Sequence, residues 1–421
     1  METYLICLAV AMIGGLMLSR LTKLVHLPVV TAYLLAGLLL GPFCIGALGV
    51  KGLGFSSLEQ VEGLRIVTQT ALGFIAFTIG NEFRLTQLKA MGSRAIIIGI
   101  LQAVITTAMV DVVLVALSLC FPSVITIPSA ITLGAIAAAT APAATLMVVR
   151  QYKANGPLTK LLLLVVAIDD AVGLLLFSVS YGVATALSMG HVSVTAVVVE
   201  PIVEIVLSLL LGSAMGWLLN LLERFFHSRS KRMTLSVAFV LLTVGLSMLE
   251  FDVAGIHCGF SLLLVCMMTG TIFCNVCDTS EELMSRVDGW TMPINVLFFV
   301  ISGAELDLNV LSSPVTILVG VLYIIARSLG KYFGAAVSCR ITGEPKNISD
   351  HLGITLLPQA GVALGMALTA SALPGVAMVR NVVLFAVLIY ELVGPTLTKR
   401  SLTLAGEINP EGRTSARKLN G

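Results

Sequence analysis

Two adjacent aspartates, Asp169 and Asp170, lie in the middle of an apolar segment that runs from about residue 157 to 187. Burying one carboxylate among apolar side chains is costly, and a second one beside it adds repulsion between like charges. A Ser, Thr or Asn would supply a polar anchor at lower cost, so the pair indicates a functional site. Neighbouring helical residues point about 100° apart, so one carboxylate can face a cavity while the other faces a partner helix. Burial and repulsion favour the protonated form, in which a carboxyl group can exchange its proton for a cation.

Basic side chains inside the other apolar segments are the natural counter-charges for this pair. Arg327 and Lys331 lie four residues apart, on one face of a helix predicted over about 312–338. We expect Arg327 to form a buried ion pair with Asp169, and Lys331 is the alternative residue for the same role. Removal of one partner from a buried ion pair leaves an uncompensated charge, which makes such pairs important for stability.

The elements that position these residues are predicted to be membrane helices. The chain has 421 residues, of which 57% are hydrophobic and 11% charged, and its mean hydropathy is +1.02. A soluble domain of this length needs a larger charged surface. The net charge is only +2, and no run of charges or basic–aromatic patch points to nucleic acid. The composition therefore predicts an integral membrane protein whose partner is the lipid bilayer.

Charges and turn residues divide the sequence into about thirteen candidate helices, each near the ~20 residues needed to cross the hydrocarbon core. We place them at about 3–20, 28–45, 58–81, 94–119, 127–149, 157–187, 196–222, 233–250, 255–275, 289–305, 312–338, 350–373 and 378–398. Glu2 precedes the first apolar run and Arg20 and Lys23 follow it, which is the reverse of a signal peptide. With the N-terminus outside, basic residues concentrate in the inward loops, as the positive-inside rule expects. We expect the N-terminus outside and the C-terminus inside.

Two of these helices carry a proline near their middle, in Thr140-Ala141-Pro142 and in Pro358-Gln359-Ala360-Gly361. A proline at mid-membrane kinks or unwinds a helix, which is tolerated where the break is buried in protein or faces water. Breaks at matching positions of two halves indicate inverted repeats with a binding site between them. We predict a membrane domain over 1–400, with repeats at about 3–187 and 233–398, a linker helix at about 196–222, and a short polar cytoplasmic tail over 401–421. Thr140 and Gln359 are candidates for offering an oxygen or amide group to an ion.

The sequence resembles the monovalent cation:proton antiporter superfamily over about residues 5–400, more specifically its second branch of bacterial Na+/H+ and K+/H+ antiporters. Ala139-Thr140-Ala141-Pro142-Ala143 resembles the crossover helix of that family, and Ile168-Asp169-Asp170 resembles its paired-acid ion site. Ala326-Arg327-Ser328-Leu329-Gly330 resembles its basic G-K-x-x-G motif. The remaining matches are Leu27 to Gly37 closed by Gly41-Pro42, Gly80-Asn81-Glu82-Phe83 at a helix end, and Leu297 to Gly303 followed by Leu306-Asp307-Leu308.

The resemblance implies a role for each matching position. Asp170 would be the principal ion-binding and proton-exchanging carboxylate, with Asp169 as its companion facing the basic residue. Arg327 would occupy the position of that basic residue, and Thr140 would contribute at the unwound crossing. Glu82 is a solvated helix cap or a group lining the cavity. The resemblance also implies a homodimer in which a core bundle moves against a fixed dimerisation domain.

Three positions depart from the family pattern. Ala141 stands where Ser or Asp is usual, so that one oxygen ligand is missing, and Gln359 replaces a residue that is charged in some relatives. Arg327 cannot release a proton at biological pH, whereas a buried Lys can. With Arg327 as the partner of Asp169, we expect one-for-one, electroneutral exchange.

The sequence therefore predicts an all-α secondary antiporter, not an enzyme, that exchanges Na+ or Li+ for protons in a bacterial cytoplasmic membrane. K+/H+ exchange by the same fold is the alternative transport function, and an ion channel or membrane sensor is the alternative from another class. We expect no cofactor, and no metal site beyond the transported monovalent cation. Cys274 and Cys277 have CxxC spacing, but no second pair or His cluster accompanies them.

Overall fold

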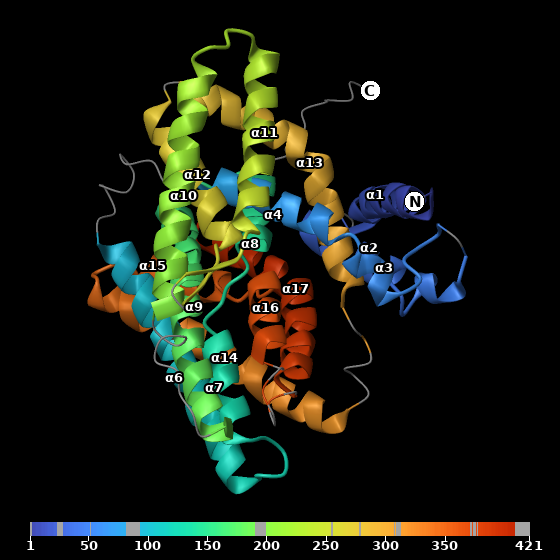
Figure 1. The fold of residues 1–421 in the computed structure, drawn as a ribbon. Helices are drawn as coiled ribbons and strands as arrows, with labels where there is room; N and C mark the ends of the chain where they lie inside the picture. Colours follow the sequence, from blue (N-terminus) through green and yellow to red (C-terminus); the bar gives the residue numbers. More distant parts are fainter. Residues whose placement is uncertain are drawn as a thin grey trace.

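The structure of the chain is a computed structural model that consists almost entirely of helices (Figure 1). It describes residues 2–22, 28–50, 52–80, 93–189, 199–253, 256–277, 279–306, 308, 313–370, 373, 376 and 378–408. Eight of the described helices are individually long and apolar enough to cross a membrane. Four further apolar helical segments are shorter, spanning Arg65–Gly80, Ile127–Ile136, Leu262–Val276 and Gly289–Ala304. The protein is a multi-pass integral membrane protein, and the number of about thirteen spans stays a prediction.

The helices form two bundles. The first contains the N-terminal helices that lie at the right of Figure 1 and the helices that pack on them. Its members are α1 (Glu2–Thr22), α2 (Val29–Leu40), α3 (Leu58–Glu62), α4 (Arg65–Gly80), α11 (Arg229–Ser247), α12 (Leu262–Val276) and α13 (Ser280–Ala304). Helix α10 (Glu200–Glu223) packs mainly on α12, and with α11 it forms the long hairpin that reaches the top of the view.

Close contact between α2 and α13 depends on two glycines. A Cβ atom on Gly37 would lie 1.9 Å from the carbonyl oxygen of Val300, and one on Gly303 would lie 2.1 Å from that of Leu34. Larger residues at these positions would push the two helices apart. Small residues at such crossings are the usual means by which membrane helices pack closely.

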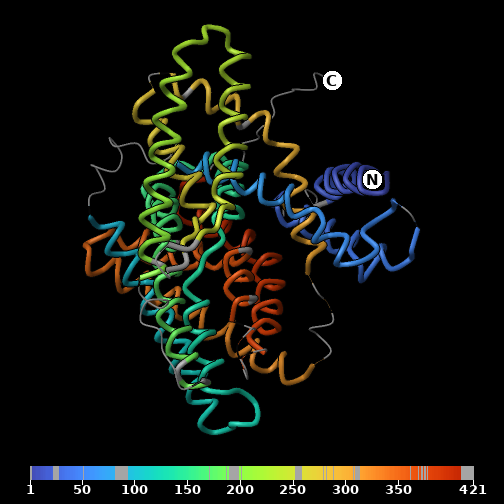
Figure 2. Tube along the Cα trace, in the orientation of Figure 1, coloured from blue at the N-terminus to red at the C-terminus, as the bar shows by residue number. Residues whose placement is uncertain are grey.

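The second bundle contains both aspartates and both basic residues of the predicted site. Its members are α6 (Arg94–Cys120), α7 (Ile127–Ile136), α8 (Pro142–Gln151), α9 (Pro157–Met189), α14 (Pro314–Ile341), α15 (Lys346–Thr355), α16 (Gly361–Ala370) and α17 (Met378–Leu404). Helices α6 and α14 are distant in sequence but pack along each other. The course of the chain from one to the other can be traced in Figure 2. Local sequence fixes several helix starts: the hydroxyls of Thr126 and Ser313 accept hydrogen bonds from the backbone at the starts of α7 and α14, and Pro314 is at the first position of α14.

Among the predicted helices whose boundaries differ from the structure, three change the local fold. The helix predicted over 58–81 is divided into α3 and α4 around Gly63. The helix predicted to start at 255 begins at Leu262, because a short antiparallel hairpin of β1 (Phe251–Val253) and β2 (Ile256–Cys258) precedes it. Helix α13 begins at Ser280, about two turns before the predicted start at 289. Apart from this hairpin and a 3-10 turn at Ile45–Leu48, the regular elements in the described part of the chain are α-helices.

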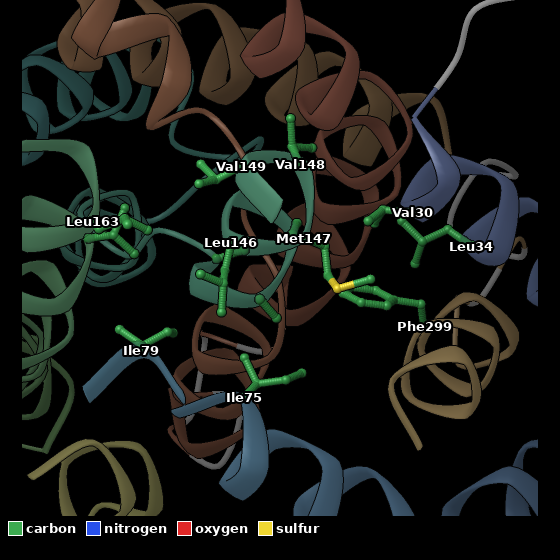
Figure 3. Close-up of a cluster of buried hydrophobic side chains, with 14 of the residues drawn as sticks. Val30, Leu34, Ile75, Ile79, Leu146, Met147, Val148, Val149, Leu163 and Phe299 are labelled. Atoms are coloured by element: carbon green, nitrogen blue, oxygen red, sulfur yellow. The ribbon is translucent and has the colours of Figure 1, made fainter. Parts of the chain in front are cut away.

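The two bundles meet through apolar side chains. Met147 and its neighbours on α8 project towards Ile75 on α4, Val30 on α2 and Phe299 on α13 (Figure 3). The Met147 thioether lies beside the Phe299 ring in this view. A hydrogen bond from the Val29 amide to Gln151 Oε1, at 2.8 Å, also joins α2 to α8. Apolar burial and dispersion therefore stabilise most of the contact surface between the bundles, and directional bonds contribute little.

The segment after α17 caps the helix that carries the aspartates. Glu407 Oε1 accepts a hydrogen bond from the Leu158 amide at 2.6 Å, and Oε2 accepts from the amide and hydroxyl of Thr159 at 2.7 and 2.6 Å. These groups lie in the first turn of α9, where a carboxylate satisfies free N–H groups and complements the helix dipole. Helix α17 continues to Leu404, so the tail predicted from residue 401 begins as helix and then packs on α9.

We expect Glu407→Ala to lower the stability of the folded protein by about 1–2 kcal/mol, because the first turn of α9 then loses its acceptor. Thermal unfolding in detergent measures this as a lower melting temperature. Glu250→Ala is the matched control, since Glu250 is an exposed glutamate for which the described part of the chain shows no hydrogen bond or ion pair. Equal melting temperatures for the two variants would contradict the capping role.

Candidate functional site

Both predicted helix breaks are present, and they lie against each other. Helix α7 ends at Ile136 and α8 begins at Pro142, while α15 ends at Thr355 and α16 begins at Gly361. The amide of Ala141 donates a hydrogen bond to the carbonyl of Pro358 at 2.8 Å, which joins the two extended segments. Each break leaves backbone carbonyls without helical partners inside the protein, where an unsatisfied polar group is costly.

Arg327 on α14 satisfies three of these carbonyls. Its Nε donates to the Ala137 carbonyl at 3.0 Å, and its two terminal nitrogens donate to Leu357 at 2.7 Å and Ala139 at 2.8 Å. The guanidinium also lies over the ring of Tyr390, with its central carbon 4.5 Å from the ring centroid. Arg327 thus links the break between α7 and α8 to that between α15 and α16. A positive charge at two helix C-termini is also electrostatically favourable.

Lys331, one turn further along α14, contacts the carboxylate. Its Nζ lies 2.9 Å from Asp169 Oδ2, and both side chains are fully buried. The same ammonium lies within hydrogen-bond distance of the Thr140 hydroxyl at 3.0 Å, the Ala138 carbonyl at 2.7 Å and Gln102 Oε1 at 3.0 Å. The predicted ion pair between Asp169 and Arg327 is therefore wrong, and Lys331, named as its alternative, takes that place. Arg327 lies one helical turn away from Lys331, and each of its three nitrogens donates to a carbonyl of the breaks instead.

The Asp169 carboxylate is enclosed by donors. Thr140 donates its hydroxyl to Oδ2 at 2.7 Å, and the Gln102 amide donates to Oδ1. Together with Lys331, these groups give both carboxylate oxygens a donor. The donors come from α6, from the segment before α8 and from α14. A buried charge pair is tolerated when its remaining hydrogen-bonding positions are filled in this way. The Asp169–Lys331 pair carries no net charge when Asp169 is ionised and Lys331 is protonated.

The spacing of glycines explains the register of α14. Gly330 and Gly334 flank Lys331 in Gly330-Lys331-Tyr332-Phe333-Gly334, which has the G-K-x-x-G spacing one turn after the segment 326–330 assigned from the sequence. A Cβ on Gly330 would lie 2.9 Å from Thr106 Cα, and one on Gly334 would lie 3.0 Å from the Gln102 carbonyl oxygen. These glycines let α6 approach α14 closely, so that Gln102 reaches the ammonium.

Gln359 is fully buried within the second break. Its Nε2 donates to the Ile136 carbonyl at 3.0 Å and to the hydroxyl of Tyr323 at 2.9 Å. These bonds tie the break to the end of α7, as Arg327 does. The structure therefore gives Gln359 a position in the support of the crossing, and its predicted contact with a cavity stays a prediction.

The remaining predicted site residues are only partly covered by the structure. Asp170 follows Asp169 in α9, but its side chain lies outside the described residues. Glu82 falls in residues 81–92, which also lie outside them. Of the residues that surround Asp169, sequence reasoning missed Gln102. A single amide within the apolar helix α6 is the signal that would have selected it.

The geometry predicts a coupling between Asp169 and Lys331 that Arg327 does not share. Asp169→Asn or Lys331→Gln leaves one buried charge without its partner, at a cost of about 3–5 kcal/mol. We expect the double variant to recover part of that loss, because it removes both charges together. Thermal melting of the purified protein in detergent measures the cycle. Asp169→Asn combined with Arg327→Gln is the matched control, in which the two losses add; recovery there instead would restore the pair predicted from the sequence.

Comparison with known proteins gives the family. The sequence profile of the family described as "Sodium/hydrogen exchanger, transmembrane" matches residues 8–403. The ammonium/H(+) antiporter subunit AmhT of Alkalihalophilus pseudofirmus is 24% identical over 299 residues, which cover 70% of this chain and 71% of that protein. The K(+) efflux antiporter 5 of Arabidopsis thaliana is 40% identical over 96 residues, and this match covers 23% of the chain and only 14% of that longer protein.

Solved structures show the same fold. The sodium proton antiporter MjNhaP1 of Methanocaldococcus jannaschii at pH 8 superposes with a TM-score of 0.69, covering 95% of this chain and 97% of that one at 18% identity. A structure of MjNhaP1 from electron microscopy gives a TM-score of 0.72, with 96% and 98% coverage at 18% identity. The matched profile spans nearly the whole described membrane region, including both broken helices and the buried Asp169–Lys331 pair. The chain belongs to the sodium/hydrogen exchanger family of multi-pass membrane cation:proton antiporters.

Proposed function

We propose that the protein exchanges Na+, or Li+, for protons across a membrane by alternating access. The observation that carries the proposal is the buried Asp169–Lys331 pair at the point where two broken helices cross. An intramembrane carboxylate held by a titratable ammonium can release that partner when a cation binds. Breaks of this kind place helix ends and backbone carbonyls around a midplane site in secondary transporters. An ion channel would need a continuous hydrated path and gains nothing from a buried ion pair of this kind.

Within this proposal the side chains have separate roles. Asp170 binds the cation and exchanges protons, and Asp169 with Thr140 completes the site from the adjacent turn and the crossing. Lys331 holds Asp169 while the site is free of cation and carries a proton of its own. Arg327 and Gln359 keep the crossing intact and take no part in exchange, since Arg327 donates to three backbone carbonyls and Gln359 donates to the Ile136 carbonyl and the Tyr323 hydroxyl.

The names of two relatives favour other cations as the substrate. One similar protein is named a K+ efflux antiporter and another an ammonium/H+ antiporter subunit, so K+ and NH4+ are the alternative substrates. Exchange by the purified protein in proteoliposomes, followed with a pH-sensitive dye, tests Na+, Li+, K+ and NH4+ in turn. Proton movement with Na+ or Li+ supports the proposal. Movement with K+ or NH4+ alone would transfer it to the alternative, and none with any cation would refute it.

We also propose a location and an assembly. The protein lies in a bacterial cytoplasmic membrane with its N-terminus outside and its C-terminus inside, as the distribution of basic loop residues supports. It forms a homodimer through the first bundle, and the second bundle moves against it. The apolar contact surface between the bundles supports this arrangement, because sliding there breaks few directional bonds.

We expect Asp170→Asn to abolish cation-driven proton movement while the protein stays folded. An amide cannot carry a proton between solutions or offer a full charge to a cation. Proteoliposome exchange and thermal melting measure the two parts of this prediction separately. Asp350→Asn, at a position on α15 away from the crossing, is the matched control and should leave exchange close to that of the wild type. Normal exchange by a well-folded Asp170→Asn protein would remove Asp170 from the site.

The contact between Lys331 and Asp169 supports a proposal that differs from the electroneutral exchange expected from the sequence. A buried lysine can lose its proton, whereas an arginine stays charged. Two groups can then titrate against one cation, so that we propose electrogenic exchange. Sodium-driven proton flux is measured in vesicles whose membrane potential is clamped with valinomycin and K+. The wild-type flux should shift with voltage, and Lys331→Arg should lose that dependence. A wild-type flux that ignores voltage would reinstate the one-for-one assignment.

A further inference from the structure

Glu391 is a buried acid within α17 that the site described above does not use. Its side chain is only 5% exposed, and the described part of the chain offers it neither a hydrogen bond nor an ion pair. An ionised carboxylate in such a place is strongly disfavoured. Two other acids that the structure buries, Asp169 and Glu223, have donors: Asp169 has three, and Glu223 pairs with Arg232 at 3.0 Å and accepts from Thr279 at 3.1 Å. A proton bound to Glu391 would remove this cost without a partner side chain.

Glu391 lies on α17, a helix that packs against elements of both bundles. Its neighbour Tyr390 faces α14, where its hydroxyl bonds to Ser328 at 2.9 Å and to the Ile324 carbonyl at 2.9 Å. Consecutive helical residues point about 100° apart, so Glu391 is turned away from that contact. Helix α17 also packs on α2 of the first bundle, and Leu392, the next residue, packs against apolar clusters of both bundles.

Acidic groups lead from the surface towards Glu391. The Glu305 carboxylate, at the end of α13, is near enough to Glu391 for two negative charges there to repel each other. Glu62 and Arg65, around the start of α4, are near enough to Glu305 for their charges to repel and attract it, respectively. Exposure falls along this series: Glu62 is exposed, Glu305 is half-buried and Glu391 is buried. The series begins on the side of the membrane where α13 ends and α4 begins, which the topology proposed above assigns to the outside.

Among the described residues, no cation is paired with Glu391. Of the ionisable residues on α17 and on the elements packed against it, Glu305 is the one with a described electrostatic effect on Glu391. Arg327 and Lys331 are committed to the breaks and to Asp169. The others are Tyr33 on α2, Arg150 on α8, Tyr323, Tyr332, Cys339 and Arg340 on α14, Lys346, Asp350 and His351 on α15, and Arg380, Tyr390, Lys399 and Arg400 on α17 itself.

The ligand that suits this environment is a proton. A monovalent cation needs several oxygen ligands to replace its hydration shell, and the described residues show Glu391 no hydroxyl or carbonyl partner. A proton needs one oxygen. We propose that Glu391 is a proton-loading carboxyl, which binds a proton from the solution on the Glu305 side and holds it between the two bundles. One proton is bound and later released, and no other group is consumed. The inference rests on the proposed antiport and adds a second proton-binding residue to it.

The test is the dependence of exchange on the pH of each side separately, in proteoliposomes with a single orientation. In the wild type, proton binding at Glu391 should keep the exchange rate constant as pH rises on the Glu305 side, until the pH is high enough for Glu391 to lose its proton. In Glu391→Gln, the rate should fall from the start of that rise, by about tenfold per pH unit. The dependence on the pH of the other side should be unchanged. Glu391→Asp should restore part of the pH range over which the exchange rate is constant, and Glu250→Gln should behave as the wild type.

A spectroscopic measurement keeps the inference testable apart from transport. Infrared difference spectra of the detergent-purified protein between acid and alkaline pH should contain a carboxylic-acid carbonyl band that Glu391→Gln removes. A purely structural, permanently protonated Glu391 gives no such titrating band and leaves the pH profile unchanged, and either result would overturn the inference. If the wild type moves no protons with any cation, the proposed function fails, while the infrared band still decides whether Glu391 binds and releases a proton.

Discussion

The need to satisfy backbone carbonyls at two broken helices governs the centre of this structure. Inside a membrane protein, a carbonyl without a partner costs several kcal/mol, and the breaks after α7 and α15 expose several such groups side by side. Helix α14 supplies the donors: Arg327 for Ala137, Ala139 and Leu357, and Lys331 for Ala138. The carboxylate of Asp169 then completes the environment of the ammonium. The position of α14 against both breaks is thus the condition for everything else in the site.

Arginine and lysine divide this work according to their chemistry. The guanidinium has five donors in a fixed plane and keeps its charge, which suits the permanent support of backbone groups. The ammonium is compact and able to lose its proton, which suits a partner that must release a carboxylate. Since the two residues lie one turn apart on the same face, exchanging their roles would leave the carbonyls with a group that can become neutral. The arrangement therefore ties structural support to Arg327, and the proposed antiport assigns proton exchange to Lys331.

Much of the fold and part of the site could be predicted from residue types and spacing. The prolines at Pro142 and Pro358 located both breaks, because a proline removes a backbone donor and its ring clashes with the preceding turn, which favours a break there. The adjacent aspartates selected the correct helix. The partner of Asp169 was placed one turn too early, since Arg327 and Lys331 share a helical face and periodicity alone does not rank them. The glycines at 330 and 334, which set the approach of α6, carry that information only once the neighbouring helix is known.

Contacts that depend on distant segments were beyond sequence reasoning. Gln102 is polar but uncharged, and its role arises from the meeting of α6 with α14. The cap that Glu407 provides for α9 joins residues about 250 positions apart, and local sequence around either end gives no sign of it. The hairpin before α12 was also missed, because its strands are only three residues each.

The distribution of polar contacts constrains how such a protein can move. Within the second bundle, the breaks, α6, α9 and α14 are joined by hydrogen bonds and a buried ion pair, so displacing one of them alone would expose unsatisfied groups. Between the bundles, the contact around Met147 and Phe299 is apolar, and apolar surfaces can slide without leaving donors or acceptors unpaired (Figure 3). We infer that the crossing moves with its whole bundle rather than by rearrangement inside it. The cation site would then keep its geometry while the side of the membrane to which it opens changes.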